Sequence, residues 1–339
     1  MKTPTIDLHC HFIPPAIDDR IQSDGGSRSV TMTDDGRVSF AGRTVTQGYP
    51  PGMRDLDDRL RQMDSAEVDV QIVSAWMDFS ANVLDPEDGA WFARSLNELT
   101  AEAVAAHPDR LRAMAAVPLQ APELAAEELR YALGQLGMVA VEIATSVGDH
   151  ELDDPSIEPF WKTAEELDVL VLVHPLNASL GFERLRRSYF LDNIVSNPAE
   201  ETVAAANLIY GGVLERHPRL KICLTHGGGF LPYQIGRQDR GFAAVPGKTA
   251  VNVGNPPSTF LRRFYYDTVV HDTEALRFLV GRVGADRVVL GSDYPFPMGD
   301  PTPVTTVLEA GLDEATVRAI LTDNPLAALG LERGDVERG

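Results

Sequence analysis

Four histidines and one aspartate stand at the ends of short apolar segments that lie far apart in the sequence. His9 and His11 close the segment TIDLHCH, His174 closes VLVLVH, His226 closes KICLTH, and Asp293 closes RVVLGSD. Imidazole nitrogens and carboxylate oxygens are ligands of Zn²⁺, and the same groups transfer protons near neutral pH. If these five side chains meet, they can hold a metal ion and handle a proton beside it.

The ligand pattern favours one divalent ion. His9 and His11 are two positions apart in a predicted strand, so both side chains point to the same side of it. Three imidazoles and a carboxylate suit Zn²⁺ and leave a position for water or substrate, while Fe²⁺ and Mn²⁺ also fit chemically. A single histidine at the end of a buried strand is usually only a hydrogen-bonded polar residue. Four of the eight histidines in such places, joined by an aspartate, favour a site.

Short apolar segments alternate with helix-like segments along the chain. The predicted strands are Thr5–Cys10, Gln71–Trp76, Leu111–Pro118, Met138–Ala144, Val169–His174, Lys221–His226, Phe264–Val269 and Arg287–Asp293. The predicted helices are Pro86–His107, Ala121–Leu136, Ile157–Leu167, Pro198–Arg216, Asp272–Val283 and Glu314–Leu321. Eight strand–helix units predict an α/β fold, a (β/α)₈ TIM barrel. Active sites of such barrels lie at the C-terminal strand ends, where the five residues stand.

Two segments interrupt this alternation. Residues 12–54 are rich in Gly, Pro and Asp and contain VTMTDDGRVSFAG, in which Asp-Asp-Gly is a hairpin signal. We interpret 12–54 as an insertion after the first strand that acts as a lid over one end of the barrel. In residues 227–257, glycine and proline surround a shorter helix at 231–242. Without a linker or repeat, residues 1–339 are expected to form one domain.

Composition excludes several classes of protein. The formal charge of −20 in 339 residues repels phosphate backbones, so a nucleic-acid partner is not expected. No run of about 18 apolar residues is present, and the N-terminus lacks the apolar core of a signal peptide, so no membrane association is expected. Cys10 and Cys223 both lie in apolar segments, which disfavours a disulfide and fits a cytoplasmic location.

The same motifs carry a resemblance to a known family. The opening IDLHCHFIPP has the D-x-H-x-H pattern of the amidohydrolase superfamily. VLVHPLN, KICLTHGGGFLPYQIGR and VVLGSDYPFPMGD resemble the branch that contains aminocarboxymuconate semialdehyde decarboxylase and related non-oxidative decarboxylases. RLRQMD, RFYYDTVVHD and NPLAALGLE extend this resemblance over nearly the whole chain.

The resemblance implies a role for each site residue. The metal ligands of the branch fall on His9, His11, His174 and Asp293, and its catalytic histidine falls on His226, with Asp293 also able to relay a proton. Arg237 matches an arginine that binds a substrate carboxylate and can come from a neighbouring subunit, which implies a homodimer. Hydrolytic members carry a carboxylated lysine on the fourth strand. The segment MVAVEIA has no lysine, so a binuclear hydrolase site is not expected.

Two positions depart from the branch pattern. Gln47 stands where relatives carry a second carboxylate-binding arginine, and Asn193 stands where a tryptophan is expected. Both would shape the organic part of the substrate pocket. These departures argue against aminocarboxymuconate semialdehyde itself as the substrate.

The function most strongly indicated is non-oxidative decarboxylation of an unsaturated or aromatic carboxylic acid, a small-molecule substrate. Within enzymes, the alternative is a hydratase or hydrolase that uses the same site to add water to a related acid or lactone. A catalytically silent binding protein on the same barrel is the alternative outside enzymes, since fold alone does not determine function. The presence of all five site residues argues against a catalytically silent protein.

Overall fold

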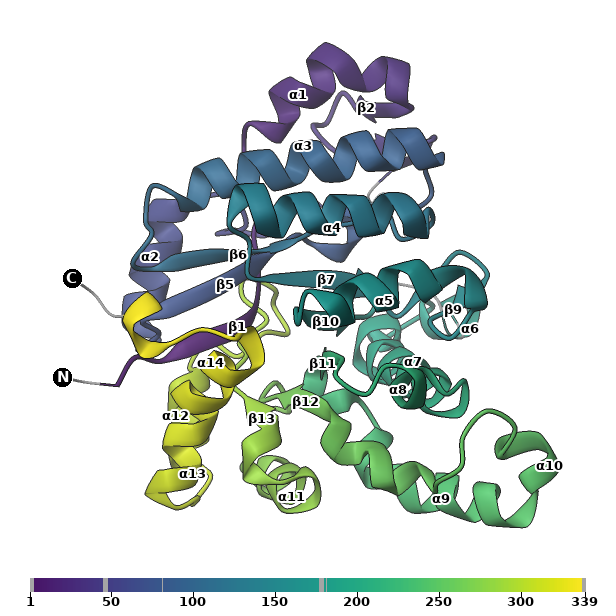
Figure 1. Ribbon diagram of the computed structural model, residues 1–339. Helices are drawn as coiled ribbons and strands as arrows, with labels where there is room; N and C mark the ends of the chain where they lie inside the picture. The colour runs from purple at the N-terminus through teal and green to yellow at the C-terminus, as the bar shows by residue number, and fades with distance from the viewer. Residues whose placement is uncertain (1–2, 45–47, 81, 177–179, 181, 337–339) are drawn as a thin grey trace.

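Eight parallel strands form the centre of the molecule in the computed structural model, which describes residues 3–44, 48–80, 82–176, 180 and 182–336 (Figure 1). Their order in the sheet is β1-β5-β6-β7-β10-β11-β12-β13. Their bounds are Ile6–His11, Val70–Ser74, Leu111–Ala115, Ala140–Ala144, Leu170–His174, Lys221–Leu224, Phe264–Asp267 and Val288–Val289. All eight predicted strands are therefore present, each within a few residues of its predicted segment.

The sheet closes between its first and last members. The backbone nitrogen of Leu8 donates to the carbonyl of Leu290 at 2.9 Å, and that of His11 donates to Tyr294 at 2.7 Å. The backbone nitrogen of Asp293 donates in turn to the carbonyl of His9 at 2.8 Å. These bonds join β1 to the segment after β13, so the predicted (β/α)₈ barrel is confirmed.

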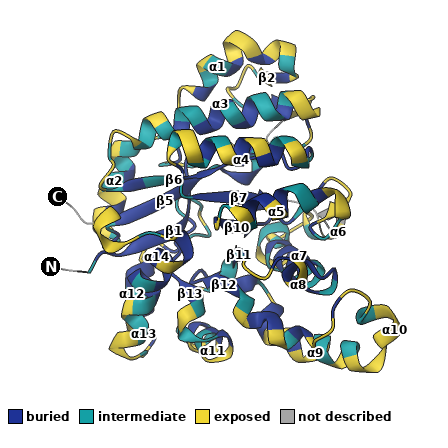
Figure 2. Ribbon diagram, viewed as in Figure 1, coloured by how far each residue is buried: buried dark blue, intermediate teal, exposed yellow. Residues whose placement is uncertain are grey.

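Helices surround this barrel and expose their outer faces, whereas the strands are buried (Figure 2). The helices that follow the strands are α2 Leu56–Ser65, α3 Pro86–Val104, α4 Pro122–Leu136, α5 Glu158–Glu166, α7 Asn197–Tyr210, α8 Val213–Arg216, α9 Leu231–Ala244, α11 Thr273–Val283, α12 Pro303–Glu309, α13 Glu314–Arg318 and α14 Asn324–Leu329. Among the described residues, no helix has both the length and the apolar character that a membrane crossing requires.

One predicted helix is divided in the structure. The segment predicted as Pro198–Arg216 forms α7 and α8, which are separated at Gly211 and Gly212. Gly212 has φ +74, and a Cβ there would lie 2.4 Å from the carbonyl oxygen of Asn252. The close approach of backbone to backbone requires glycine at this point, and its left-handed conformation interrupts the helix.

The barrel interior is divided into an apolar and a polar layer. A buried apolar cluster takes one or two residues from every strand: Ile6, Leu8, Val70, Ile72, Met114, Ala140, Leu170, Leu172, Cys223, Tyr265 and Val289. Alternation along each strand then brings polar side chains inward one step later, towards the C-terminal ends. In β1 the pairing register shifts between Asp7 and Cys10. Because of this irregularity, His9 joins the polar layer although Leu8 lies in the apolar one.

The segment predicted as an insertion, residues 12–54, has secondary structure of its own in its described part. It contains α1 Ile17–Asp24 and three antiparallel strands, β2 Val30–Met32, β3 Val38–Phe40 and β4 Arg43–Thr44. β2 and β3 form the hairpin indicated by Asp-Asp-Gly. Ile17, Val30 and Phe40 pack with Phe79 and Phe92 beside α3, where Figure 1 places α1 and β2. The lid function of this insertion stays a prediction.

The turn after β11 has an unusual backbone. His226, Gly227, Gly228 and Gly229 have φ values of 48, 63, 74 and 59, all in the left-handed region. A Cβ at Gly229 would lie 2.0 Å from the carbonyl oxygen of Pro198 at the start of α7. The glycines therefore permit this turn and allow it to approach α7.

We expect Gly229→Ala to lower the free energy of unfolding by about 2 kcal/mol or more, because a left-handed alanine is strained and its Cβ has no room. Gly134→Ala is the matched control, since nothing lies within 4 Å of a Cβ at that exposed position in α4. That change should stabilise by up to about 1 kcal/mol through helix propensity. Apparent melting temperatures of the two variants measure the contrast, and equal values would contradict it.

Candidate active site

Three histidines and one aspartate meet in the polar layer of the barrel. Single ligand atoms of His9, His11, His174 and Asp293 all lie within 4.8 Å of one another, and the four side chains are buried. The Nε2 atoms of His9 and His11 are 3.2 Å apart. Asp293 Oδ1 lies 3.1 Å from His11 Nε2 and 3.3 Å from His9 Nε2. The structure thus brings together the four residues predicted to hold the metal.

The other ring nitrogen of each histidine is anchored by an acceptor. His9 Nδ1 lies 2.6 Å from Asp267 Oδ2 at the end of β12. His11 Nδ1 is 3.2 Å from the carbonyl oxygen of Ala75, and His174 Nδ1 is 2.8 Å from that of Pro175. A proton on each Nδ1 satisfies these acceptors and leaves the Nε2 lone pairs free, as in many metal sites.

This donor set fits a divalent metal ion. His174 Nε2 is buried and has no hydrogen-bond partner among the residues that the structure describes. An unpartnered buried nitrogen is costly unless another group binds it, and the facing Nε2 atoms of His9 and His11 share the same need. Three nitrogens and one carboxylate oxygen match the ligands of a site for one divalent ion.

The buried carboxylates around the cluster also favour a bound cation. Burial opposes protonation of His9, but Asp267 and Asp293 outweigh it and raise the pKa of His9 to about 10. Burial opposes ionisation of Asp293, but hydrogen bonds from the histidines hold its pKa well below its usual range. Burial raises the pKa of Glu142, which lies in β7 with Oε1 3.8 Å from His11 Nδ1, to about 8. Asp267 and Asp293 therefore stabilise positive charge at the centre, whereas burial favours the neutral form of Glu142.

His226 lies beside the four-residue cluster with a carboxylate at each ring nitrogen. Its Nε2 is 3.5 Å from Asp293 Oδ2, and its Nδ1 is 2.7 Å from Oε1 of Glu201 in α7. Burial lowers the pKa of His226, but Glu201 and Asp293 overcome this and raise it well above its usual range. Both His226 and Asp293 have left-handed backbones, with φ values of 48 and 56. Such strained residues persist where the surrounding structure holds them firmly, which is frequent at functional sites.

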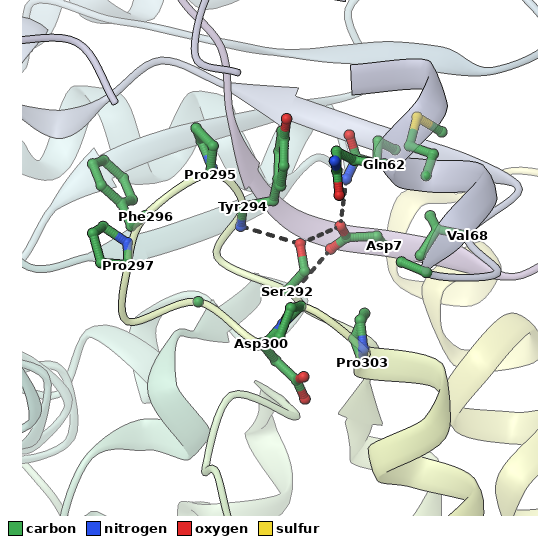
Figure 3. Close-up of a pocket in the computed structure, with 15 residues that line it drawn as sticks. Asp7, Gln62, Val68, Ser292, Tyr294, Pro295, Phe296, Pro297, Asp300 and Pro303 are labelled. Carbon is green, nitrogen blue, oxygen red and sulfur yellow. Dashed lines mark hydrogen bonds between the residues drawn. The ribbon is translucent and has the colours of Figure 1, made fainter. Parts of the chain in front are cut away.

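Asp7, the first residue of the D-x-H-x-H pattern, supports the site from the outer side of β1. It accepts hydrogen bonds from Ser292 Oγ at 2.5 Å, Ser292 N at 3.0 Å, Gln71 Nε2 at 2.9 Å and His9 N at 3.2 Å. Figure 3 shows Ser292 held between Asp7 and the backbone of Tyr294. These bonds fix the backbone on both sides of Asp293 and so direct its carboxylate towards the histidines.

The cavity drawn in Figure 3 is separate from the histidine cluster. It has a volume of about 290 Å³ and is lined by residues of α2 and of the segment 292–303, among them Gln62, Tyr294 and Asp300. None of the five site residues is among those that line it. Asp7 lines this cavity, but its carboxylate already accepts four hydrogen bonds from the protein and is not free to bind a ligand.

Of the residues predicted to bind substrate, the two that the structure describes, Asn193 and Arg237, make no hydrogen bond or ion pair with this cluster within the described part of the chain. Gln47 lies outside the described residues. Asn193 is half-buried in the π-helical turn Asp192–Ser196 before α7, and no hydrogen bond of its side chain to the cluster is present in the described part of the chain. Arg237 is exposed on α9 and has no ion pair with any described residue. Asp239, its nearest acid in sequence, instead accepts from the backbone nitrogen of Ser258 at 2.9 Å.

Three carboxyl groups of the site were missed by the sequence analysis: Asp267, Glu142 and Glu201. Asp267 ends β12 just as Asp293 follows β13, so its place at a strand end was a usable signal. Glu142 interrupts an apolar strand, AVEIA, which also marks it as unusual. Glu201 sits in the helix segment NPAEETVAAANLIY, where glutamate is ordinary, and gave no signal.

The chain is similar to known proteins over nearly its whole length. The sequence matches the amidohydrolase family over residues 6–331. A 2-amino-3-carboxymuconate-6-semialdehyde decarboxylase from Dictyostelium discoideum is 33% identical over 335 residues, which cover 96% of this chain and 92% of that protein. The chain therefore belongs to the amidohydrolase family.

Solved structures of decarboxylases superpose on the chain over nearly its whole length. The 5-carboxyvanillate decarboxylase of Sphingomonas paucimobilis superposes with a TM-score of 0.83 at 25% identity, covering 98% of this chain and 100% of that one. A dihydroxybenzoic acid decarboxylase from Polaromonas sp. JS666, with bound manganese and the inhibitor 2-nitroresorcinol, has a TM-score of 0.79 at 26% identity and covers 97% of each chain.

The ligand set can be tested by metal content. The purified protein should contain about one divalent ion per chain, and His174→Ala should lose it, because a ligand nitrogen is removed. His150→Ala is the control, since His150 is exposed and pairs with Asp154, which is not one of the ligands. Plasma mass spectrometry measures the metal in all three proteins. Full occupancy in His174→Ala would show that His174 is not a ligand.

Proposed function

We propose that this chain is a metal-dependent non-oxidative decarboxylase of an unsaturated or aromatic carboxylic acid. The observation that carries the proposal is the buried cluster of His9, His11, His174 and Asp293 with His226 beside it. The names of the similar decarboxylases state that they act on acids of this kind, and the chain spans nearly their whole length.

Zinc is the metal that we propose for the cluster, because three of the four ligands are imidazoles. Manganese is the alternative, since the similar dihydroxybenzoic acid decarboxylase contains it. The cytoplasm is the proposed location, because both cysteines are buried and free and a reducing compartment keeps them so.

Decarboxylation breaks the bond between the substrate carbon and its carboxylate, releases CO₂, and returns one proton to that carbon. A divalent ion in the cluster would supply a Lewis acid that stabilises negative charge on substrate oxygen atoms. His226 is the proposed proton carrier, because its Nε2 faces the cluster while its Nδ1 is held by Glu201. Asp293, 3.5 Å from His226 Nε2, is positioned to share a proton with it. Glu201 and Asp293 are buried and only 16% of the His226 side chain is exposed, which limits the access of bulk water to the proton transfer.

Arg237 is the proposed anchor for a substrate carboxylate, supplied across a homodimer interface. A chain with a charge of −20 needs a local cation to attract an anion, and the Arg237 guanidinium is exposed and free of ion pairs among the described residues. Tyr233 is 75% exposed one helical turn earlier, so both side chains lie on one face of α9. Tyrosine and arginine are enriched in protein interfaces, which supports this face as the dimer contact. Gln47 and Asn193 stay as proposed determinants of substrate identity.

Carbon dioxide release tests the proposed reaction. A panel of hydroxybenzoates and muconate-type acids should include a substrate that releases CO₂, and His226→Asn should lower kcat by about 10²–10⁴-fold while keeping its metal. Product analysis by mass spectrometry distinguishes the outcomes. Water addition without CO₂ would indicate a hydratase or hydrolase, and no turnover of any acid by the metal-loaded protein would favour a binding protein. Near-normal kcat in His226→Asn would remove that residue from the mechanism.

For Arg237→Ala we expect a strong rise in KM, because a carboxylate contact is lost. Arg237→Lys should restore binding only partly, since an ammonium group cannot make two parallel hydrogen bonds to a carboxylate. Mixing Arg237→Ala chains with inactive Asp293→Ala chains should recover activity if the arginine acts across the dimer. Sedimentation at assay concentration gives the subunit count, and a fully active monomer would overturn the shared arginine.

A further inference from the structure

Glu201 is a buried carboxylate that takes no direct part in the bond changes of the reaction outlined above. It lies in the first turns of α7 with none of its surface exposed. We infer that Glu201 is a positioning residue, which holds His226 with its proton on Nδ1 and its Nε2 directed at the metal cluster. The inference rests on the proposed role of His226, although part of its test is independent of turnover.

The left-handed turn after β11 brings Glu201 to His226. The Phe230 backbone nitrogen donates to Thr202 Oγ1 at 2.8 Å, and Thr202 Oγ1 donates to the Pro198 carbonyl at 2.8 Å. Gly229 touches the same carbonyl, since a Cβ there would lie 2.0 Å from it. The turn is therefore docked on the first turn of α7, and this docking sets the distance between Glu201 and His226.

The hydrogen bonds of Glu201 converge on a single oxygen. Its Oε1 accepts from His226 Nδ1 at 2.7 Å and also from the Thr225 hydroxyl, in a very short contact. Its Oε2 is buried and has no hydrogen-bond partner among the described residues. Leaving Oε2 unsatisfied costs free energy. The side-chain hydrogen bonds of Glu201 to described residues therefore go through Oε1 to the neighbouring residues Thr225 and His226.

The hydrogen bond between His226 Nδ1 and Glu201 determines the direction in which Nε2 of the ring points. An imidazole whose Nδ1–H is donated to a carboxylate presents Nε2 to the opposite side, and here that side holds Asp293 Oδ2 at 3.5 Å. The backbone nitrogen of His226 is fixed separately, by a 3.0 Å bond to Asp267 Oδ2. The backbone and the ring of His226 are thus held by different carboxylates, and within His226 the hydrogen bond of Glu201 is to the ring.

Glutamine at position 201 keeps the size of the side chain but replaces the charged acceptor with an amide, which either accepts weakly from Nδ1–H or donates to Nδ1 and reverses the tautomer. In the zinc-loaded protein, Glu201→Gln should lower kcat by about 10–100-fold with little change in KM or metal content, in the range known for groups that orient a functional histidine. Zinc is chosen because it is diamagnetic and permits NMR.

The ring proton gives the direct measurement. Proton NMR of zinc-loaded protein labelled with ¹⁵N-histidine should show a downfield Nδ1–H signal that is absent from His226→Asn. In Glu201→Gln, that signal should move upfield or disappear.

Glu200→Gln is the matched control, because Glu200 is the adjacent buried glutamate but its Oε2 pairs with Thr145, at 3.3 Å. This variant should keep the His226 signal and the kcat. An unchanged signal with unchanged kcat in Glu201→Gln would overturn the inference, as would loss of zinc that matched the loss of activity. If no acid is turned over, the proposed function fails, while the NMR comparison still decides whether Glu201 holds the ring.

Discussion

The site depends on the junction between the first strand and the segment after the last strand. Asp7 receives four hydrogen bonds there, two of them from Ser292, and the backbone of Asp293 bonds to that of His9. This junction both closes the barrel and sets the carboxylate of Asp293 between two imidazoles. A barrel closed in another register would separate ligands that lie 282 positions apart in sequence. The contacts that close the barrel therefore also set the geometry of the metal ligands.

The fold and the centre of the site were accessible from the sequence for a physical reason. Parallel strands buried on both faces are continuously apolar, so a polar residue at the end of such a strand stands out, as His174 does after VLVLV. The two histidines of HCH were also correctly placed on one side. Leu8 points into the barrel, so strict alternation would turn His9 and His11 outward. The register shift in β1 turns both histidines inward. A sequence does not reveal such a shift, because it depends on the neighbouring strand.

Other features depend on tertiary contacts that no local pattern encodes. Glu201 reaches His226 only because a glycine-rich turn docks on α7, and its own sequence context is that of a solvent-facing helix start. The break at Gly212 follows from the close passage of Asn252. Asn193 and Arg237 were chosen by resemblance to a family, and a single chain does not bring them to the metal ligands. Their role in substrate binding stays a prediction, because no contact among the described residues links them to the metal ligands.

The junction that closes the barrel also has a consequence for biosynthesis. The ribosome delivers His9, His11 and His174 well before Asp293, and a domain generally folds as a unit. The nascent chain therefore holds an incomplete, nitrogen-only set of ligands until its final barrel strand docks. Pairing over so long a separation is slow, because the loop-closure entropy must be overcome first. Loading with metal is consequently tied to the last stage of folding, after the polypeptide is nearly complete.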